Sequence, residues 1–361
     1  MKSLILTLCL IISFWACKET TAIDPTPTTP SYDFTEVDNL LAQNLTSAYK
    51  GSVYVAVNKD GKSIYTKGLG GFSESTNRLI ASCTKTYAGV VILSLVDDGL
   101  LSLDDSIGRY LPIFTKYKKG NCTIRQCFSH TGGWDDSGDT YISSRTLTLA
   151  QATDEIAKNI PYANKPGTAF DYAGISMQIV GRVAEVVSKK SWNQLFKEKI
   201  VDKLGLTDSE FTVSSDANPR IAGGMTSSPS DILKLSEMIL NKGVYKNTRV
   251  LSEKAWGELW KDQTNGAKIV YTPYPTVPNI NNPYNATETR YSIGAWLNVQ
   301  NPTTKYVEQI SGDGAFGTSF WIDRCRNVTG VIFTFSSFQS TALSNFKIED
   351  AVRKQTGVGC K

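Results

Sequence analysis

Two residues with complementary chemistry, Ser82 and Lys85, lie three positions apart at the start of an apolar run, residues 90–96. Residues with this spacing share one face of a helix, so the Lys amine can approach the Ser hydroxyl. The run predicts a helix, with Ser82 in its first turn. There the free backbone N–H groups and the positive end of the helix dipole favour a developing negative charge. The pair therefore predicts an activated serine nucleophile.

The role of Lys85 depends on its surroundings. If apolar neighbours depress its pKa, the amine can act as a base or proton relay, and in either protonation state it can orient the Ser hydroxyl. The spacing alone is a weak signal, because Ser344 and Lys347 show it too. That second pair opens an amphipathic run of mixed charge (344–355), so we interpret it as the start of a surface helix.

Further sequence blocks accompany Ser82 in a fixed order. They are residues 81–85, 95–105, 110–112, 123–133, 166–172, 222–227 and 315–318. Together these blocks resemble the serine β-lactamase-related family, which comprises class C β-lactamases, DD-peptidases and related esterases. The resemblance covers roughly residues 33–338. It implies an exported serine hydrolase that forms an acyl-enzyme on an ester or amide and uses no metal or cofactor.

The family uses three catalytic elements: a Ser-x-x-Lys, which is the pair above, a Tyr-x-Asn, and a Lys/His-x-Gly on an edge strand. Tyr172 best matches the second, because Pro-Gly precedes it, but Gly174 stands where Asn is expected. Tyr162 and Tyr245 begin literal Tyr-x-Asn sequences and are weaker alternatives because of their places in the chain. The resemblance implies that Tyr172 is a general base in acylation and then an acid, its pKa lowered by the neighbouring ammonium.

The third element departs most from the family, because Gly312 stands where Lys or His is usual. A literal His-Thr-Gly begins at His130, but it precedes Tyr172, so we interpret His130 as structural. The resemblance still implies the backbone function of this third element. The N–H of Ala315 is expected to join that of Ser82 in an oxyanion hole, which needs no particular side chain.

The residues expected to contact the substrate are Gly174, Gly312, Asp313, Gly314 and Ala315. Without the Asn amide and the cation, a substrate with a carboxylate, such as a β-lactam or a D-Ala-D-Ala terminus, is disfavoured. Asp313 can favour an amine-bearing substrate instead, although we interpret it first as a solvated loop residue. We predict an esterase or peptidase that acts on a small or peptide-like substrate. A β-lactamase or D-Ala-D-Ala carboxypeptidase proper, and a catalytically silent cell-wall or peptide-binding protein, are the alternatives.

Composition excludes other classes of function. The 361 residues carry a net charge of only +4, which argues against a strongly basic nucleic-acid binder. There are seven Cys without a Cys-x-x-Cys pair and a single His, so the sequence offers few ligands in a spacing suited to zinc. We therefore expect no nucleic acid and no metal, and we expect a monomer.

The first residues are typical of an export signal. A Lys precedes an apolar run from Leu4 to Trp15, which is too short to span a bilayer. We predict a lipoprotein-type signal over 1–16, lipidation of Cys17 and a Thr/Pro-rich tether over 17–32. The protein would then be anchored to a membrane and face the periplasm or cell surface, with ordinary secretion as the alternative.

An exported body would keep an odd number of cysteines, so at least one thiol stays unpaired. We predict a disulfide between Cys325 and Cys360 that fixes the C-terminus, and a second between Cys122 and Cys127. Cys83 would then be the free thiol.

These residues must be positioned by strands near both ends of the chain and helices between them. Strand patterns occupy 52–57, 63–66, 291–299, 317–323 and 328–335, and helical patterns occupy 34–48, 85–98, 148–159, 176–188, 191–203, 230–241 and 344–355. We predict an α/β (α+β) fold: a mainly antiparallel sheet from the N- and C-terminal segments, flanked by helices, with an inserted mainly helical lobe. The catalytic domain would be 33–361, with the sheet lobe at about 33–85 and 288–361 and the helical lobe at about 86–287.

Overall fold

The computed structural model describes residues 31–275, 288–301 and 303–360. The chain divides into two units, Met1–Tyr32 and Asp33–Lys361. The predicted signal (1–16), the lipidation residue Cys17 and nearly all of the tether (17–32) lie outside the described residues. Within the described part, no helix combines the length and the apolar character that a bilayer crossing requires.

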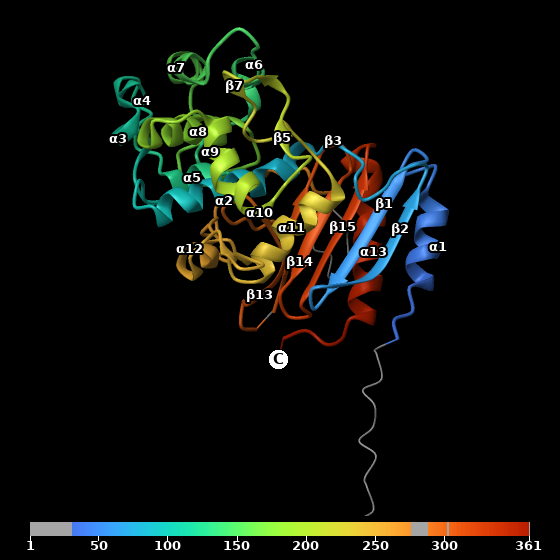
Figure 1. Ribbon diagram of the computed structural model, residues 1–361. Coiled ribbons are helices and arrows are strands. Elements are labelled where there is room, and N and C mark those ends of the chain that lie inside the picture. The colour runs from blue at the N-terminus through green and yellow to red at the C-terminus, as the bar shows by residue number, and fades with distance from the viewer. Residues whose placement is uncertain (1–30, 276–287, 302, 361) are drawn as a thin grey trace, which may run out of the picture. The chain divides into compact units, whose positions relative to one another are not determined.

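A six-stranded antiparallel sheet organises the unit Asp33–Lys361 (Figure 1). In spatial order its strands are β12 (Trp296–Gln300), β13 (Val307–Asp313), β14 (Ser319–Asp323), β15 (Val328–Thr334), β1 (Val53–Lys59) and β2 (Lys62–Leu69). β1 pairs with β15, so strands from the two ends of the chain lie side by side. The predicted fold class is confirmed. The sequence reasoning missed β13, a fully buried strand that carries part of the site.

Helices cover both faces of this sheet (Figure 1). α1 (Thr35–Asn44) and α13 (Phe338–Gln355) contact each other, and their apolar side chains join those of β1 in one cluster. α11 (Pro229–Leu240) contacts β14 and β15, and its apolar side chains belong to the other cluster. Although α11 falls in the range assigned to the helical lobe (86–287), it is part of the sheet layers.

The helix α13 begins earlier than predicted. Ser337 caps it, and its side chain accepts a hydrogen bond from the N–H of Ser340. Ser344 is therefore a buried residue within the helix, and the interpretation that it starts a surface helix is wrong. The helix starts earlier because residues 338–343 continue its amphipathic pattern, with Phe338, Thr341 and Ala342 buried.

The rest of the unit is mainly helical. Its helices are α2 (Thr84–Asp97), α3 (Ile107–Tyr110), α4 (Pro112–Lys116), α5 (Ile124–Phe128), α6 (Asp139–Ile142), α7 (Leu149–Asn159), α8 (Ile175–Ser188), α9 (Trp192–Phe196), α10 (Asp202–Leu204) and α12 (Glu253–Glu258). Short strands connect them: β3 (Arg78–Leu79), β4 (Ala169–Asp171), β5 (Glu210–Phe211), β6 (Ser214–Ser215), β7 (Asn218–Pro219), β8 (Met225–Ser227), β9 (Val244–Tyr245), β10 (Thr248–Arg249) and β11 (Lys268–Tyr271).

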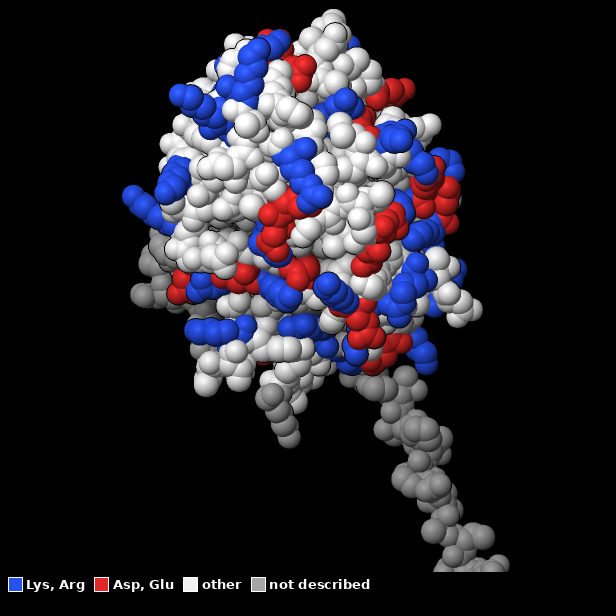
Figure 2. Space-filling view, turned by 90° about the vertical axis from the view of Figure 1, so that its left-hand side faces the viewer, with Lys and Arg blue, Asp and Glu red and all other residues white. Residues whose placement is uncertain are grey.

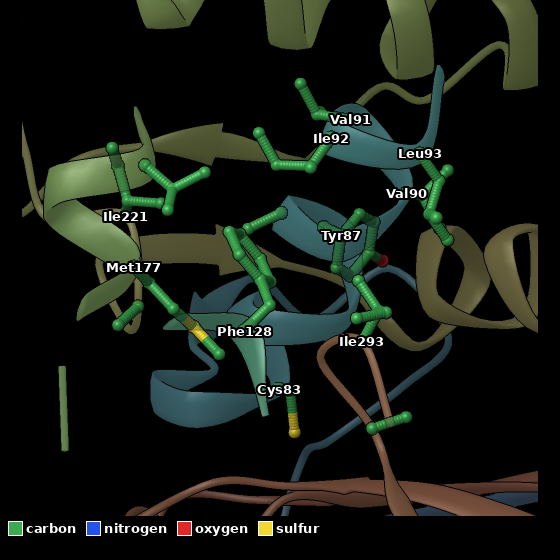
Figure 3. Close-up of a cluster of buried hydrophobic side chains, with 14 of the residues drawn as sticks. Cys83, Tyr87, Val90, Val91, Ile92, Leu93, Phe128, Met177, Ile221 and Ile293 are labelled. Carbon is green, nitrogen blue, oxygen red and sulfur yellow. The ribbon is translucent and has the colours of Figure 1, made fainter. Parts of the chain in front are cut away.

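The helix α2 is the central element of this part. Every residue from Thr84 to Leu95 is buried, as expected of a helix that is apolar all round. Figure 3 shows its side chains among Phe128, Met177 and Ile293 from other elements. This packing fixes the N-terminal end of α2, where the predicted nucleophile and its lysine lie.

The surface carries no dominant charge on the face that Figure 2 shows. Lys and Arg side chains alternate there with Asp and Glu side chains. Several form ion pairs across neighbouring elements, such as Lys199 with Asp98. On this face the charges are therefore mixed and do not form separate patches of opposite sign.

The cysteines follow the sequence prediction in part. Cys325 and Cys360 form a disulfide, as predicted, and Cys83 is a free, buried thiol. The predicted bridge between Cys122 and Cys127 is wrong, because both are free. Their sulfur atoms are in contact at 3.4 Å, well beyond the bond length of about 2 Å that a disulfide needs.

Replacing Cys325 and Cys360 with Ser is expected to lower the free energy of unfolding by about 3 to 4 kcal/mol, since a 35-residue loop regains its freedom in the unfolded chain. Urea unfolding of the oxidised wild type and the double variant measures this difference. Reduced wild type should match the variant. Equal midpoints for the oxidised wild type and the variant would contradict the prediction.

Candidate active site

The predicted nucleophile lies in a tight turn that leads into α2. Ser82 is the middle residue of the 3-10 turn Ala81–Cys83, which directly precedes α2, whereas the sequence placed it in the first turn of the helix itself. Ala81 has a φ of +45°, a left-handed conformation that is uncommon for a residue with a side chain. Thr84 holds this turn, because its hydroxyl donates to the Ala81 carbonyl at 2.5 Å. The Ser82 side chain remains partly exposed.

Lys85 lies directly beneath Ser82 and is 4% exposed. Its Nζ donates to the Ser82 Oγ at 2.9 Å and to the Ala222 carbonyl at 2.7 Å. Burial lowers the pKa of Lys85 to about 7, although the nearby Asp136 carboxylate opposes this shift. A neutral amine still donates one N–H to Ala222 and turns its lone pair toward the Ser82 hydroxyl. The geometry therefore suits proton transfer from Ser82 to Lys85.

Tyr172 completes the trio that the sequence predicted. It follows β4, and its N–H donates to the Tyr271 carbonyl at 3.1 Å. The Lys85 Nζ lies 4.7 Å from the centre of its ring, and Trp296 stacks on the ring at 4.8 Å. Burial raises the pKa of Tyr172 above its ordinary value, although a hydrogen bond with Ser82 acts the other way. The expected lowering of this pKa is therefore wrong, because loss of solvent is the largest effect on the hydroxyl.

His130 fixes the position of Tyr172 from both sides. Its carbonyl accepts the N–H of Asp171 at 2.9 Å, and its Nδ1 accepts the N–H of Ala173 at 3.2 Å. Its ring lies 4.3 Å from that of Tyr172. Burial lowers the pKa of His130 well below its ordinary value, so the ring is neutral and Nδ1 is free to accept. His130 is a positioning residue that acts through Tyr172.

Removing this support is expected to impair turnover more than binding. In His130→Ala, we expect kcat to fall about 10- to 100-fold with a KM within about threefold, because the Ala173 N–H loses its acceptor and the Tyr172 ring loses its neighbour, while the main-chain bond to Asp171 remains. His130→Asn is the matched variant, since Asn tolerates the positive φ of 58° and its side-chain oxygen can still accept the Ala173 N–H. It should recover most of kcat. Equal kcat for wild type and His130→Ala would contradict the positioning role.

The two alternative tyrosines lie elsewhere. The Tyr162 hydroxyl donates to the Lys119 carbonyl at 2.7 Å, and its ring packs on Trp134. Tyr245 belongs to the short strand β9. Neither residue lines a cavity that contains Ser82, so Tyr172 is the tyrosine that the fold brings to the nucleophile.

The turn between β13 and β14 supplies the second backbone donor. Gly314 donates its N–H to the Thr318 carbonyl and accepts that of Gly317, both at 2.8 Å. A Cβ at Gly314 would lie 2.3 Å from the Ile80 carbonyl oxygen, so only glycine allows this approach. Ala315 then lines the same cavity as Ser82. Neither the Ser82 nor the Ala315 N–H donates to another described residue, as an oxyanion hole requires.

The predictions for Gly312 and Asp313 need correction. A Cβ at Gly312 would lie 2.3 Å from the Phe320 ring, so this position faces the core and does not contact substrate. Asp313 is not a solvated loop residue, because it ends β13 and is 6% exposed. Its carboxylate accepts hydrogen bonds from three hydroxyls, those of Ser311 at 2.7 Å, Ser319 at 2.6 Å and Tyr274 at 2.7 Å.

Asp136 is a site residue that the sequence reasoning missed. Its Oδ1 accepts the N–H of Gly174, the first residue before α8, at 2.9 Å. A Cβ on Gly174 would lie 4.0 Å from that oxygen. The carboxylate therefore approaches the place where the family carries its Asn side chain. The available signal was the Asp pair at 135 and 136 after the 123–133 block, but spacing alone did not connect it to Gly174.

Two cavities meet at Ser82. The first, of about 170 Å³, is lined by Ser82, Asp136, Tyr172, Tyr271, Pro273, Trp296, Asp313, Gly314, Ala315, Phe338 and Gln339. The second, of about 370 Å³, is lined by Leu79, Ala81, Ser82, Lys85, Asp136, Tyr172, Ala173, Gly174, Val213, Arg220, Ala222, Gly223, Ala315 and Phe316. Among the described residues, no group of three His, Cys, Asp or Glu side chains is arranged to hold a metal ion.

Comparison with known proteins identifies the family of this fold. The family model described as Beta-lactamase matches residues 37–351. Protein flp of Staphylococcus aureus (strain NCTC 8325 / PS 47) is 25% identical over 189 residues, which cover 49% of this chain and 38% of that protein. Penicillin-binding protein 4 of Amycolatopsis lactamdurans is 27% identical over 219 residues, which cover 51% of this chain and 56% of that protein. The matches thus span only about two fifths to just over half of these relatives' length.

Solved structures match over most of the chain. A putative beta-lactamase from Bacteroides dorei DSM 17855 has a TM-score of 0.76 and 27% identity, and the match covers 90% of this chain and 99% of that one. EstCE1, described as a hydrolase with promiscuous acyltransferase activity, has a TM-score of 0.68 and 18% identity, with coverage of 88% and 97%. The second likeness is one of fold alone.

Proposed function

The chain belongs to the Beta-lactamase family, and from that premise we propose that it is a serine hydrolase in which an ester or amide substrate acylates Ser82. The observation that carries this proposal is the 2.9 Å contact between the Ser82 hydroxyl and the Lys85 amine. Burial holds the pKa of that amine at about 7, so a large share of it is neutral at physiological pH. The nucleophile thus has a base within hydrogen-bond distance.

In the acylation step, the Ser82 Oγ attacks the substrate carbonyl while its proton moves to the Lys85 Nζ. The carbonyl oxygen becomes negative and is held by the N–H groups of Ser82 and Ala315. As the carbonyl re-forms, the bond to the leaving group breaks. The leaving group takes a proton from the Tyr172 hydroxyl, which Lys85 replenishes, so the lysine ends neutral again.

In the deacylation step, water attacks the acyl group on Ser82. Lys85 takes its proton, the Tyr172 hydroxyl gives one to the Ser82 Oγ as the acid product leaves, and Lys85 then reprotonates Tyr172. The raised pKa of Tyr172 suits this relay, because the hydroxyl stays protonated and serves as a donor throughout.

The names of similar proteins support acyl transfer in general. EstCE1 is described as a hydrolase with acyltransferase activity, and another solved structure of this fold is a putative 6-aminohexanoate-dimer hydrolase from Bacillus anthracis. Penicillin-binding protein 4 points to cell-wall peptides, although it shares about half of its length with this chain. We favour an ester or amide substrate without a carboxylate over a β-lactam, because Gly174 and Gly312 stand where the family carries the Asn and the Lys or His that would bind one.

The test is covalent labelling. We expect a fluorophosphonate probe to modify wild-type protein, and peptide mapping to place the label on Ser82. Ser82→Ala should stay unlabelled. Absence of label on Ser82 in a protein that also leaves p-nitrophenyl acyl esters intact would contradict the proposal and favour a silent binding protein. Efficient nitrocefin hydrolysis would keep the mechanism but reverse the substrate preference.

We also propose that the protein is exported and anchored through Cys17. The apolar segment before Cys17 and the Cys325–Cys360 disulfide, which needs an oxidising compartment, support this. Expression of the full chain with radiolabelled palmitate tests it. Label in wild type and none in Cys17→Ser is expected, and secreted, unlabelled wild-type protein would contradict it.

A further inference from the structure

The smaller of the two cavities at Ser82 is lined by acidic side chains and by no basic ones among the described residues. Asp136 and Asp313 both line it, and none of its described lining residues is Lys, Arg or His. The second cavity is lined by the basic residues Lys85 and Arg220 together with the same Asp136. The two sides of the nucleophile therefore differ in electrostatic character.

Asp313 is held as an acceptor within this cavity. The three hydroxyls that donate to its carboxylate fix its orientation and favour the ionised form, although burial is the larger effect and raises the pKa of Asp313 above its ordinary value. A carboxylate has about four acceptor positions, so three donors leave one for a ligand. Asp313 also alternates with Gly312 along β13, which places it on the cavity side and Gly312 against Phe320.

Asp136 provides the second carboxylate. One of its oxygens accepts the Gly174 N–H at 2.9 Å, which fixes the side chain, and the residue stays exposed to the cavity. Because Gly174 lacks a side chain, nothing at that position separates Asp136 from a bound molecule.

The remaining wall is aromatic. The rings of Tyr172, Trp296, Tyr271 and Phe338 line the cavity, and Trp296 stacks on Tyr172 at 4.8 Å. Aromatic faces together with carboxylates are the surroundings that bind ammonium groups. A cavity of about 150 Å³ accepts benzene, so one of about 170 Å³ has room for a group of roughly six heavy atoms.

We propose that this cavity binds a small, positively charged amine-bearing part of the substrate, between Asp313 and Asp136 and against the aromatic wall. The larger second cavity holds the other part across the scissile bond. This inference rests on the proposed serine hydrolase function and specifies its substrate class: esters or amides with an ammonium group close to the reacting carbonyl.

The test compares three butyryl thioesters that differ in the charge of the thiol part: thiocholine, its neutral 3,3-dimethylbutanethiol isostere and the anionic 3-mercaptopropionate. Hydrolysis is followed by thiol release at pH 8.5, where Lys85 is neutral in wild type. We expect kcat/KM for the cationic ester to exceed that for the neutral one at least about tenfold, with the anionic ester slowest. A matched set of p-nitrophenyl esters with the same three charges on the acyl part is run in parallel, because either part of the substrate can occupy the cavity.

Asp136→Asn should reduce the cationic preference about five- to tenfold, and Asp313→Asn should reduce it further. Asp135→Asn is the matched control, because it removes the same charge from the neighbouring residue, which does not line the cavity. It should leave the preference within about twofold. Asp136 lies on the surface, so its variant remains informative if Asp313→Asn does not fold.

Calorimetry with Ser82→Ala separates this inference from the proposed function. Tighter binding of the cationic esters to Ser82→Ala supports the inference even if wild type hydrolyses none of them, an outcome that would contradict the hydrolase proposal alone. Turnover without charge preference in both ester sets, or a preference that Asp136→Asn and Asp313→Asn leave unchanged, would overturn the inference and leave the hydrolase intact.

Discussion

Lys85→Met is expected to lower kcat/KM by about 10³- to 10⁴-fold, because the Ser82 hydroxyl loses the amine that lies 2.9 Å away and accepts its proton. Met matches the length and volume of the lysine stem, so the core around α2 should stay packed. Initial rates on a p-nitrophenyl ester measure the effect. Activity within about tenfold of wild type would show that another group takes the proton.

The same lysine predicts the pH dependence of wild type. Its pKa is lowered to about 7, and only the neutral amine accepts a proton, so kcat/KM should rise with pH and level off above an inflection near 7. The wild-type inflection is the observation that identifies the base, and a rate that is flat from pH 5 to 9 would contradict the role of Lys85.

Stability, like kcat/KM, should rise with pH, because both depend on the protonation state of Lys85. In the unfolded chain Lys85 has a pKa of about 10.4, so between about pH 7 and 10 the unfolded state binds more protons and wild-type stability rises with pH. Lys85→Met removes this dependence. The variant should therefore melt higher than wild type, by the largest margin below pH 7, which also demonstrates that its loss of activity is not loss of structure.

The sequence predicted the parts of the site that depend on local spacing. Ser82 and Lys85 are three residues apart in one helical segment, so their contact follows from helix geometry. The sheet followed from strand patterns at both ends of the chain, because period-two alternation reports a half-buried strand. β13 escaped this reasoning because both of its faces are buried and its sequence therefore does not alternate.

Contacts between segments that are distant in the chain could not be predicted from the sequence. His130 and Ala173 are 43 residues apart, as are Asp136 and Gly174 at 38, and no local pattern connects them. The prediction that Asp313 is a solvated loop residue failed for a related reason. An Asp between two glycines is typical of a turn, but here hydrogen bonds from three hydroxyls allow the carboxylate to be buried. The pKa of Tyr172 was misjudged because the resemblance supplied its charged neighbour but not the extent of its burial.

Tyr172→Phe is expected to lower kcat about 10²- to 10³-fold while the inflection of kcat/KM stays near pH 7. The variant keeps the ring that stacks on Trp296 and that Lys85 contacts, and loses only the hydroxyl that passes a proton to the leaving group. Because the pKa of Tyr172 is raised, its hydroxyl does not titrate in this range, and the inflection belongs to Lys85. If Tyr172 were the base instead, the variant would lose the inflection along with the rate. A good leaving group such as p-nitrophenolate needs little protonation, so the loss should be smaller for p-nitrophenyl esters than for alkyl esters of the same acid, and equal losses on both would contradict the assignment of Tyr172 as the proton donor.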